Sequence, residues 1–178
     1  MAHPIGGQVK PWMTRADLLT ALRLPLAAAF PFAPRPAWQL VLVAAAAASD
    51  FFDGILARRL GGSRAGAVLD PIADKLFMAV AFVTVARSGL LHPAEVAAVL
   101  SRDIVAALGY VGSWLWRRPM VVPARAGGKA VTVLQLLTLV ACIVRSPYVE
   151  PLAWATAAVG LYAIWDYWQA AARANAPR

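Results

Sequence analysis

The sequence predicts an all-α fold: one domain, residues 1–178, built as an integral membrane bundle of about six transmembrane helices. Hydrophobic residues make up 61% of the chain and charged residues only 15%, whereas about a quarter of a soluble domain is charged. The apolar runs are rich in Ala, Leu and Val and lack the alternation of membrane-barrel strands. A spanning helix needs about 20 apolar residues, which leaves room for about six with short connections.

Stretches rich in Pro, Gly and Arg separate the apolar segments and set the helix boundaries. The first segment is interrupted by Arg23, which is typical of a retained membrane helix rather than a cleaved signal peptide. The second ends at "LGGSRAG", the third before "SGLLHP", the fourth before "RRPMVVPARAGG" and the fifth before "RSPYVEP". The expected helices are Thr14–Phe30, Ala37–Leu60, Gly66–Arg87, Pro93–Trp116, Gly127–Arg145 and Pro151–Arg173.

Basic residues are divided unevenly between the two sides of the predicted membrane. The side with both termini holds eleven of the 17 Lys and Arg residues: Lys10, Arg15, Arg58, Arg59, Arg64, Arg117, Arg118, Arg125, Lys129, Arg173 and Arg178. The opposite loops hold only Arg35, Arg87 and Arg145. The positive-inside rule therefore predicts a cytoplasmic-membrane protein with both termini in the cytoplasm. This arrangement, with attraction to anionic membrane lipids, accounts for the net charge of +8 without nucleic acid.

Scarce carboxylates gather in one stretch, where Asp50, Asp53, Asp70 and Asp74 make up four of the nine acidic residues. The first two are three residues apart on the second predicted helix, and the other two are four apart on the third, so each pair shares a helix face. Antiparallel helices joined by a short loop would bring the pairs together at the cytoplasmic side. A carboxylate at mid-bilayer costs roughly 2.5–3.5 kcal/mol, so hard divalent cations are expected to compensate the four charges.

A small cation or proton transporter is the alternative from another functional class, because intramembrane carboxylates also mark ion pathways. A cation path does not need the arginine and glycines that stand at fixed offsets from the carboxylates. Arg58 lies four residues after Gly54 on the same helical face, so its guanidinium can fork onto a phosphate in the space that the glycine leaves. This combination favours an enzyme.

The stretch resembles the signature of the CDP-alcohol phosphatidyltransferases, D-x-x-D-G-x-x-A-R followed by G-x-x-x-D-x-x-x-D. Its eight fixed positions are complete here: Asp50, Asp53, Gly54, Ala57, Arg58, Gly66, Asp70 and Asp74. The gap of seven residues between Arg58 and Gly66 is one shorter than is common in the family and falls in a loop. A catalytically dead scaffold is disfavoured by the intact set.

The resemblance implies transfer of a phosphatidyl group from CDP-diacylglycerol to an alcohol, with release of CMP. It implies two Mg²⁺ or Mn²⁺ ions held by Asp50, Asp53, Asp70 and Asp74, with Asp74 also the catalytic base. The residues it assigns to CDP binding are Asp50, Gly54, Arg58, Gly66 and Asp70. It further implies a homodimer, and the predicted topology puts the active site in the cytoplasm.

Matches outside this stretch look most like the glycerol-backbone branch of the family. "ADLLTALR" keeps Thr20 and Arg23 of its first-helix element but has Ala16 and Asp17 where Pro-Asn is usual. "GGKAVTVLQ" resembles G-K-x-x-T-x-x-Q, with Gln135 as its last position. The residues expected to bind the acceptor are Arg102, Arg125, Lys129 and Thr132. Convergent cations suit glycerol 3-phosphate, the favoured acceptor, whereas "SRD" at 101–103 looks more like the cardiolipin synthases, which use phosphatidylglycerol.

Overall fold

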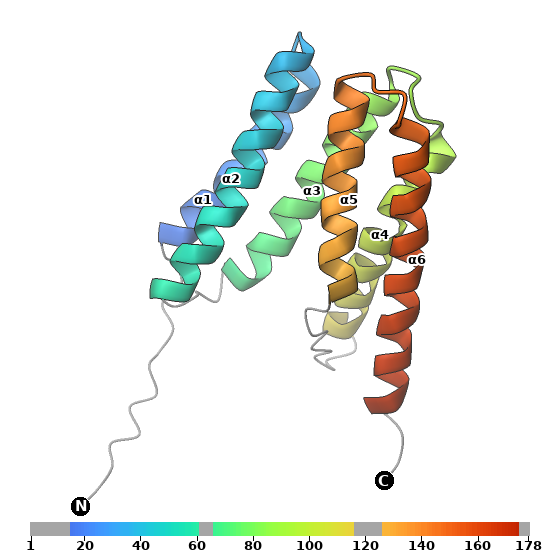
Figure 1. The fold of residues 1–178 in the computed structure, drawn as a ribbon. Helices are drawn as coiled ribbons and strands as arrows, with labels where there is room; N and C mark the ends of the chain where they lie inside the picture. Colours follow the sequence, from blue (N-terminus) through green and yellow to red (C-terminus); the bar gives the residue numbers. More distant parts are fainter. Residues whose placement is uncertain (1–14, 61–65, 116–125, 175–178) are drawn as a thin grey trace, which may run out of the picture. The chain divides into compact units, whose positions relative to one another are not determined.

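The computed structural model describes residues 15–60, 66–115 and 126–174. Within these ranges it describes side chains except at 15–19, 57–60, 66–68, 70–71, 110–115, 126 and 170–174. The regular secondary structure of the described residues is all helical, with no strand (Figure 1). Its helices are α1 (Arg15–Ala29), the 3-10 turn η1 (Phe30–Phe32), α2 (Pro36–Leu60), α3 (Gly66–Ala86), α4 (Pro93–Leu115), α5 (Ala126–Ile143) and α6 (Val149–Ala174). The six α-helices match the predicted ones to within two residues at each end, so the all-α prediction is confirmed.

Proline marks the beginning of two helices. Pro36 and Pro93 are the first residues of α2 and α4, a position where the missing N–H leaves no hydrogen bond unmade. At α4 the backbone N–H of His92 also donates to Oε2 of Glu95 at 2.7 Å. This contact is one half of a capping box, and it fixes where α4 begins.

Two of the helices are followed by a residue whose backbone angles lie in the left-handed region. Gly89, three residues after α3, has φ +75°, which glycine adopts without strain. Arg145, two residues after α5, has φ +53°. There the N–H of Ser146 donates to the carbonyl of Ala141 (2.9 Å) and the N–H of Arg145 to that of Cys142 (3.2 Å). These bonds form a Schellman motif with arginine at the position that normally favours glycine.

The chain divides into two compact units, Met1–Ala81 and Phe82–Arg178, which are described separately. In the first unit, α1 packs along α2. Phe30, in the 3-10 turn, is fully buried and meets Phe77 of α3 edge to face, with ring centroids 5.9 Å apart. This contact packs the turn after α1 against the middle of α3.

In the second unit, α6 packs against both α4 and α5. Its core is formed by small and branched side chains such as Val99, Val131 and Leu139, each buried. A buried hydrogen bond of 2.9 Å joins the hydroxyls of Thr138 on α5 and Thr156 on α6. Each hydroxyl also lies within hydrogen-bond distance of a backbone carbonyl of its own helix. The two O–H protons are shared among these three contacts, so the polar pair is satisfied within the apolar core.

The outer surface is strongly apolar. Large hydrophobic side chains are exposed on every α-helix, among them Leu22, Phe52, Leu76, Leu108, Leu137 and Trp168. By length and composition, one helix of the described chain is apolar enough to cross a membrane, over Pro36–Leu56 with a mean hydropathy of 1.5. Only 22% of that segment is buried, whereas the core helix of a soluble protein is mostly buried. The membrane-spanning character of the six α-helices stays a prediction.

Candidate active site

A buried arginine holds the first carboxylate pair of the signature. Arg23 of α1 is 1% exposed, and its guanidinium contacts both Asp50 (3.1 Å) and Asp53 on α2. The hydroxyl of Thr20, one turn earlier on α1, donates to the same Oδ2 of Asp53 at 3.2 Å. The spacing of three residues on each helix places each pair on one face, so the T-x-x-R face of α1 meets the D-x-x-D face of α2.

The two carboxylates have different environments. Asp53 is almost fully buried, and its contacts with Thr20 and Arg23 compensate for the loss of water. The side chain of Asp50 is 59% exposed, so a cation arriving from outside can reach it. One guanidinium carries a single positive charge against two carboxylates, so the Arg23 contacts alone do not neutralise the pair. The expectation that only metal compensates these aspartates was therefore incomplete, because α1 supplies part of the compensation.

The second carboxylate pair lies on the first turns of α3. Asp74 is half-buried there, and the side chain of Asp70 lies outside the described set. Among the side chains that are described, no three His, Cys, Asp or Glu residues lie close enough to hold a metal ion. The four-carboxylate metal site thus stays a prediction. Of the other residues expected to bind CDP, Gly54 is half-buried on α2, Arg58 is on α2 and Gly66 begins α3, the last two without described surroundings.

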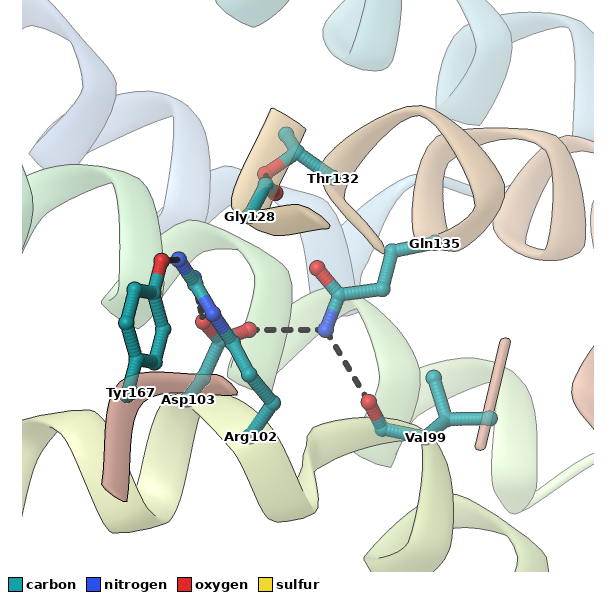
Figure 2. Close-up of polar contacts among 7 residues, drawn as sticks. All are labelled: Val99, Arg102, Asp103, Gly128, Thr132, Gln135 and Tyr167. Atoms are coloured by element: carbon teal, nitrogen blue, oxygen red, sulfur yellow. Dashed lines mark hydrogen bonds and ion pairs between the residues drawn. The ribbon is translucent and has the colours of Figure 1, made fainter. Parts of the chain in front are cut away.

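A second polar cluster, in the other unit, is centred on Arg102 of α4 (Figure 2). Its Nη1 donates to Oδ1 of Asp103 at 2.8 Å, and its Nη2 donates to the hydroxyl of Tyr167 on α6 at 3.2 Å. The guanidinium carbon lies 5.8 Å from the centre of the Tyr167 ring, within the range of a cation–π contact. The Arg102 side chain is 15% exposed, so it is fixed in a largely enclosed position.

Gln135 of α5 links this cluster to α5. Its amide Nε2 donates to Oδ2 of Asp103 at 2.7 Å and to the backbone carbonyl of Val99 at 3.0 Å. Both partners are acceptors, so the amide NH₂ is the half of the side chain that fits there. Because Gln135 is 1% exposed, its two bonds hold Asp103 in one orientation, and Asp103 in turn holds Arg102.

The residues predicted to bind the acceptor are only partly brought together. Arg102 is central to the cluster, whereas Lys129 is exposed on the first turn of α5. Thr132 is also exposed, and its hydroxyl donates to the carbonyl of Gly128 in its own helix at 3.2 Å. Arg125 lies outside the described residues. Their joint role in binding stays a prediction.

Two features of these clusters were missed from the sequence. Tyr167 was not singled out, because a tyrosine near the end of an apolar helix resembles an interfacial residue and nothing local marks its partner. Arg23 was identified as an interruption of the first helix and as a match to the family's first-helix element, but its contact with Asp50 and Asp53 was not predicted. A signal was present: Thr20 and Arg23 repeat the three-residue spacing of Asp50 and Asp53, which is the pattern expected of two complementary helix faces.

Comparison with known proteins agrees with the signature. The sequence matches the model of the family described as CDP-alcohol phosphatidyltransferase over residues 13–165. It is 33% identical over 126 residues to a protein of Mycobacterium tuberculosis named as a candidate cardiolipin synthase, covering 67% of this chain. The chain spans 59% of the length of that relative. It is 43% identical over 76 residues to a CDP-diacylglycerol–glycerol-3-phosphate 3-phosphatidyltransferase of Yersinia pestis, covering 42% of each chain. The corresponding chloroplastic enzyme of Oryza sativa is 40% identical over 70 residues, which cover 39% of this chain and 21% of that protein.

Proposed function

Because the chain belongs to the CDP-alcohol phosphatidyltransferase family, we propose that it transfers a phosphatidyl group from CDP-diacylglycerol to a glycerol-based alcohol and releases CMP. The observation that carries this proposal is the complete eight-position signature between Asp50 and Asp74, whose fixed positions lie on α2 and α3. The family match extends through both compact units, which supports one catalytic domain made of the whole helical chain.

The carboxylates have the chemistry that a hard divalent cation requires, and enzymes of this family generally depend on such a cation. Asp50 and Asp53 converge on one guanidinium, so they also converge on one position for positive charge. All-oxygen donors suit Mg²⁺ or Mn²⁺, and we assign Asp50, Asp53, Asp70 and Asp74 as the residues that would hold two ions. When bound, these ions would neutralise the diphosphate of the donor and stabilise CMP as the leaving group.

The chain's own residues then bind and activate the substrates. Arg58 forks onto the donor diphosphate, and the missing side chains of Gly54 and Gly66 leave room for the nucleotide. Asp74 accepts the proton of the acceptor hydroxyl. The hydroxyl oxygen forms a bond to the phosphorus that carries diacylglycerol, the bond from that phosphorus to the CMP oxygen breaks, and CMP leaves with the electron pair.

We propose glycerol 3-phosphate as the acceptor, bound by Arg102, Arg125, Lys129 and Thr132. Its dianionic phosphate calls for several cations, and charge-assisted contacts would supply most of its orientation. The Yersinia and Oryza relatives support this choice. Phosphatidylglycerol is the second candidate, favoured by the ion pair between Arg102 and Asp103, which cancels one of those positive charges. The mycobacterial relative, matched over more of this chain, supports the second candidate.

The same reasoning assigns a location and an assembly. We propose that the enzyme is a homodimer in the cytoplasmic membrane, with both termini and the active site facing the cytoplasm. The eleven-to-three division of basic residues supports the orientation. The apolar surface carried by all six α-helices of the described chain supports burial in lipid.

Purified protein in mixed micelles with CDP-diacylglycerol and Mg²⁺ tests the function. Glycerol 3-phosphate and phosphatidylglycerol are offered separately, and CMP and the lipid products are quantified. We expect CMP and phosphatidylglycerophosphate with the first acceptor. Cardiolipin from phosphatidylglycerol, without a product from glycerol 3-phosphate, would establish the second candidate instead. Cation flux through proteoliposomes with no CMP release would refute the enzyme and favour the transporter.

A further inference from the structure

Two neighbouring glycines near the start of α5 have very different surroundings. A Cβ added to Gly128 would lie 2.6 Å from the Tyr167 hydroxyl oxygen and 2.7 Å from Nη2 of Arg102, closer than real side chains allow. A Cβ added to Gly127 would meet only Ala163, at an ordinary contact distance of 3.5 Å. Gly128 therefore makes space for the Arg102–Tyr167 contact, whereas Gly127 packs against the helix α6 in the usual way.

The guanidinium of Arg102 is consequently confined on several sides. Asp103 fixes Nη1, Tyr167 fixes Nη2 and contributes its ring, and the bare backbone of Gly128 lies close to Nη2. Nε of Arg102 is buried and has no hydrogen-bond partner among the described residues. A buried donor in this condition is costly, and an anionic ligand at the guanidinium edge would satisfy it.

We propose that Gly128 and Tyr167 are positioning residues, which hold the guanidinium of Arg102 in the orientation that receives the phosphate of the acceptor. This inference rests on the proposed function and applies to glycerol 3-phosphate and to phosphatidylglycerol, since both carry a phosphate. The role fits the energetics of preorganisation. An arginine that is fixed before the substrate arrives loses little rotamer freedom on binding. A larger share of the interaction free energy therefore contributes to the affinity for the substrate.

Substitution at Gly128 separates this role from a purely structural one. The two atoms that an added methyl group would meet are the ends of long, flexible side chains, which can move aside at little cost in stability. The guanidinium would nevertheless leave its present position. Gly128→Ala is therefore expected to weaken acceptor binding while the protein remains folded, and Gly127→Ala is its matched control in the next residue of the same helix.

The experiment measures kcat and KM for each substrate in micelles, with the acceptor that the wild-type enzyme uses. Gly128→Ala is expected to raise the acceptor KM about 10-fold and Tyr167→Phe about 5-fold, the size of one weakened charge-assisted hydrogen bond. The KM for CDP-diacylglycerol and the thermal midpoint should remain as in Gly127→Ala. Both changes act on one guanidinium, so the double variant should also show about 10-fold rather than the roughly 50-fold product.

The failure of this inference is distinct from the failure of the proposed function. If the wild-type protein releases no CMP with either acceptor, the proposed function is wrong. If it is active but Gly128→Ala and Tyr167→Phe match Gly127→Ala, the positioning role is refuted. A parallel loss of thermal stability and of affinity for both substrates would also refute it, because that result describes a packing defect.

Discussion

Arg23 has two roles because its guanidinium contacts both Asp50 and Asp53. It compensates for part of the cost of burying Asp53, and its single positive charge does not by itself neutralise both Asp50 and Asp53. A cluster of this kind is stable without bound metal and can still attract a divalent cation. Breaking a buried ion pair by removing one partner typically costs about 3–5 kcal/mol, whereas removing both partners is often tolerated.

We expect Arg23→Met to lower the free energy of unfolding by about 3–5 kcal/mol when metal is chelated, because buried Asp53 loses its ion pair with Arg23. SDS-induced unfolding in mixed micelles measures this loss. Adding Asp53→Asn to Arg23→Met should recover much of it. Arg87→Met, an exposed arginine after α3, is the control and should change stability by less than about 0.5 kcal/mol. An Arg23→Met variant as stable as this control would contradict the structural role.

The remaining signature carboxylates are expected to matter for chemistry rather than for folding. Asp70→Asn and Asp74→Asn should each abolish CMP release in the presence of Mg²⁺, because an amide is a weaker metal ligand and cannot act as a base. Both variants should still insert into membranes at the wild-type level, measured by carbonate extraction. Binding of Mn²⁺, followed by its electron paramagnetic resonance signal, should weaken in parallel. Full activity of the wild-type enzyme after exhaustive chelation would overturn the metal assignment.

At the scale of helices, Gly89 and Arg145 both have left-handed backbone conformations after a helix, and we expect substitutions at the two positions to have opposite effects on stability. Gly89→Ala places a Cβ at φ +75° and should destabilise the protein by about 1 kcal/mol. Arg145→Gly removes a Cβ at φ +53° and should stabilise it by a similar amount. Arg145→Ala separates charge from backbone strain and should be nearly neutral. Thermal unfolding of the three variants in one detergent tests the signs, and destabilisation by Arg145→Gly would show that its side chain outweighs the strain.

The helices were predictable because residues close to each boundary in the sequence determine where each helix begins and ends. Pro93 with Glu95 begins a helix through two short-range effects, and the Pro, Gly and Arg stretches end the apolar runs where the structure ends them. Partners across helices were not predictable in the same way. Gln135 could be matched to a sequence pattern, but its bonds to Asp103 and Val99 join positions more than 30 residues apart. Tyr167 contacts Arg102 only because α4 and α6 pack together. The hydrophobic pattern within one helix does not predict which other helix packs against it.

On the scale of the whole molecule, the apolar exterior and the basic residues make a prediction about sidedness. We expect Ser63→Cys, in a chain whose Cys142 is replaced by Ala, to react with a membrane-impermeant maleimide only in inverted vesicles or permeabilised cells. The reason is that the positive-inside rule predicts a cytoplasmic position for the segment around Arg58, Arg59 and Arg64. An introduced cysteine in the opposite loop, Ser88→Cys, is the matched control and should react in intact cells. Labelling of Ser63→Cys in intact cells would reverse the topology.

The ion pair between α1 and α2 also bears on biogenesis. An arginine or aspartate at the centre of a lone helix in lipid is penalised by roughly 2.5–3.5 kcal/mol. Arg23 is near the middle of α1 and would bear this cost when α1 is alone, whereas Asp53, nearer the end of α2, would bear less of it. Only three residues, 33–35, separate η1 from α2, and the helices pack along each other. We therefore expect them to leave the translocon together as a helical hairpin whose opposite charges meet before either helix faces hydrocarbon. The first helix α1 would then enter the bilayer only after α2 has been synthesised.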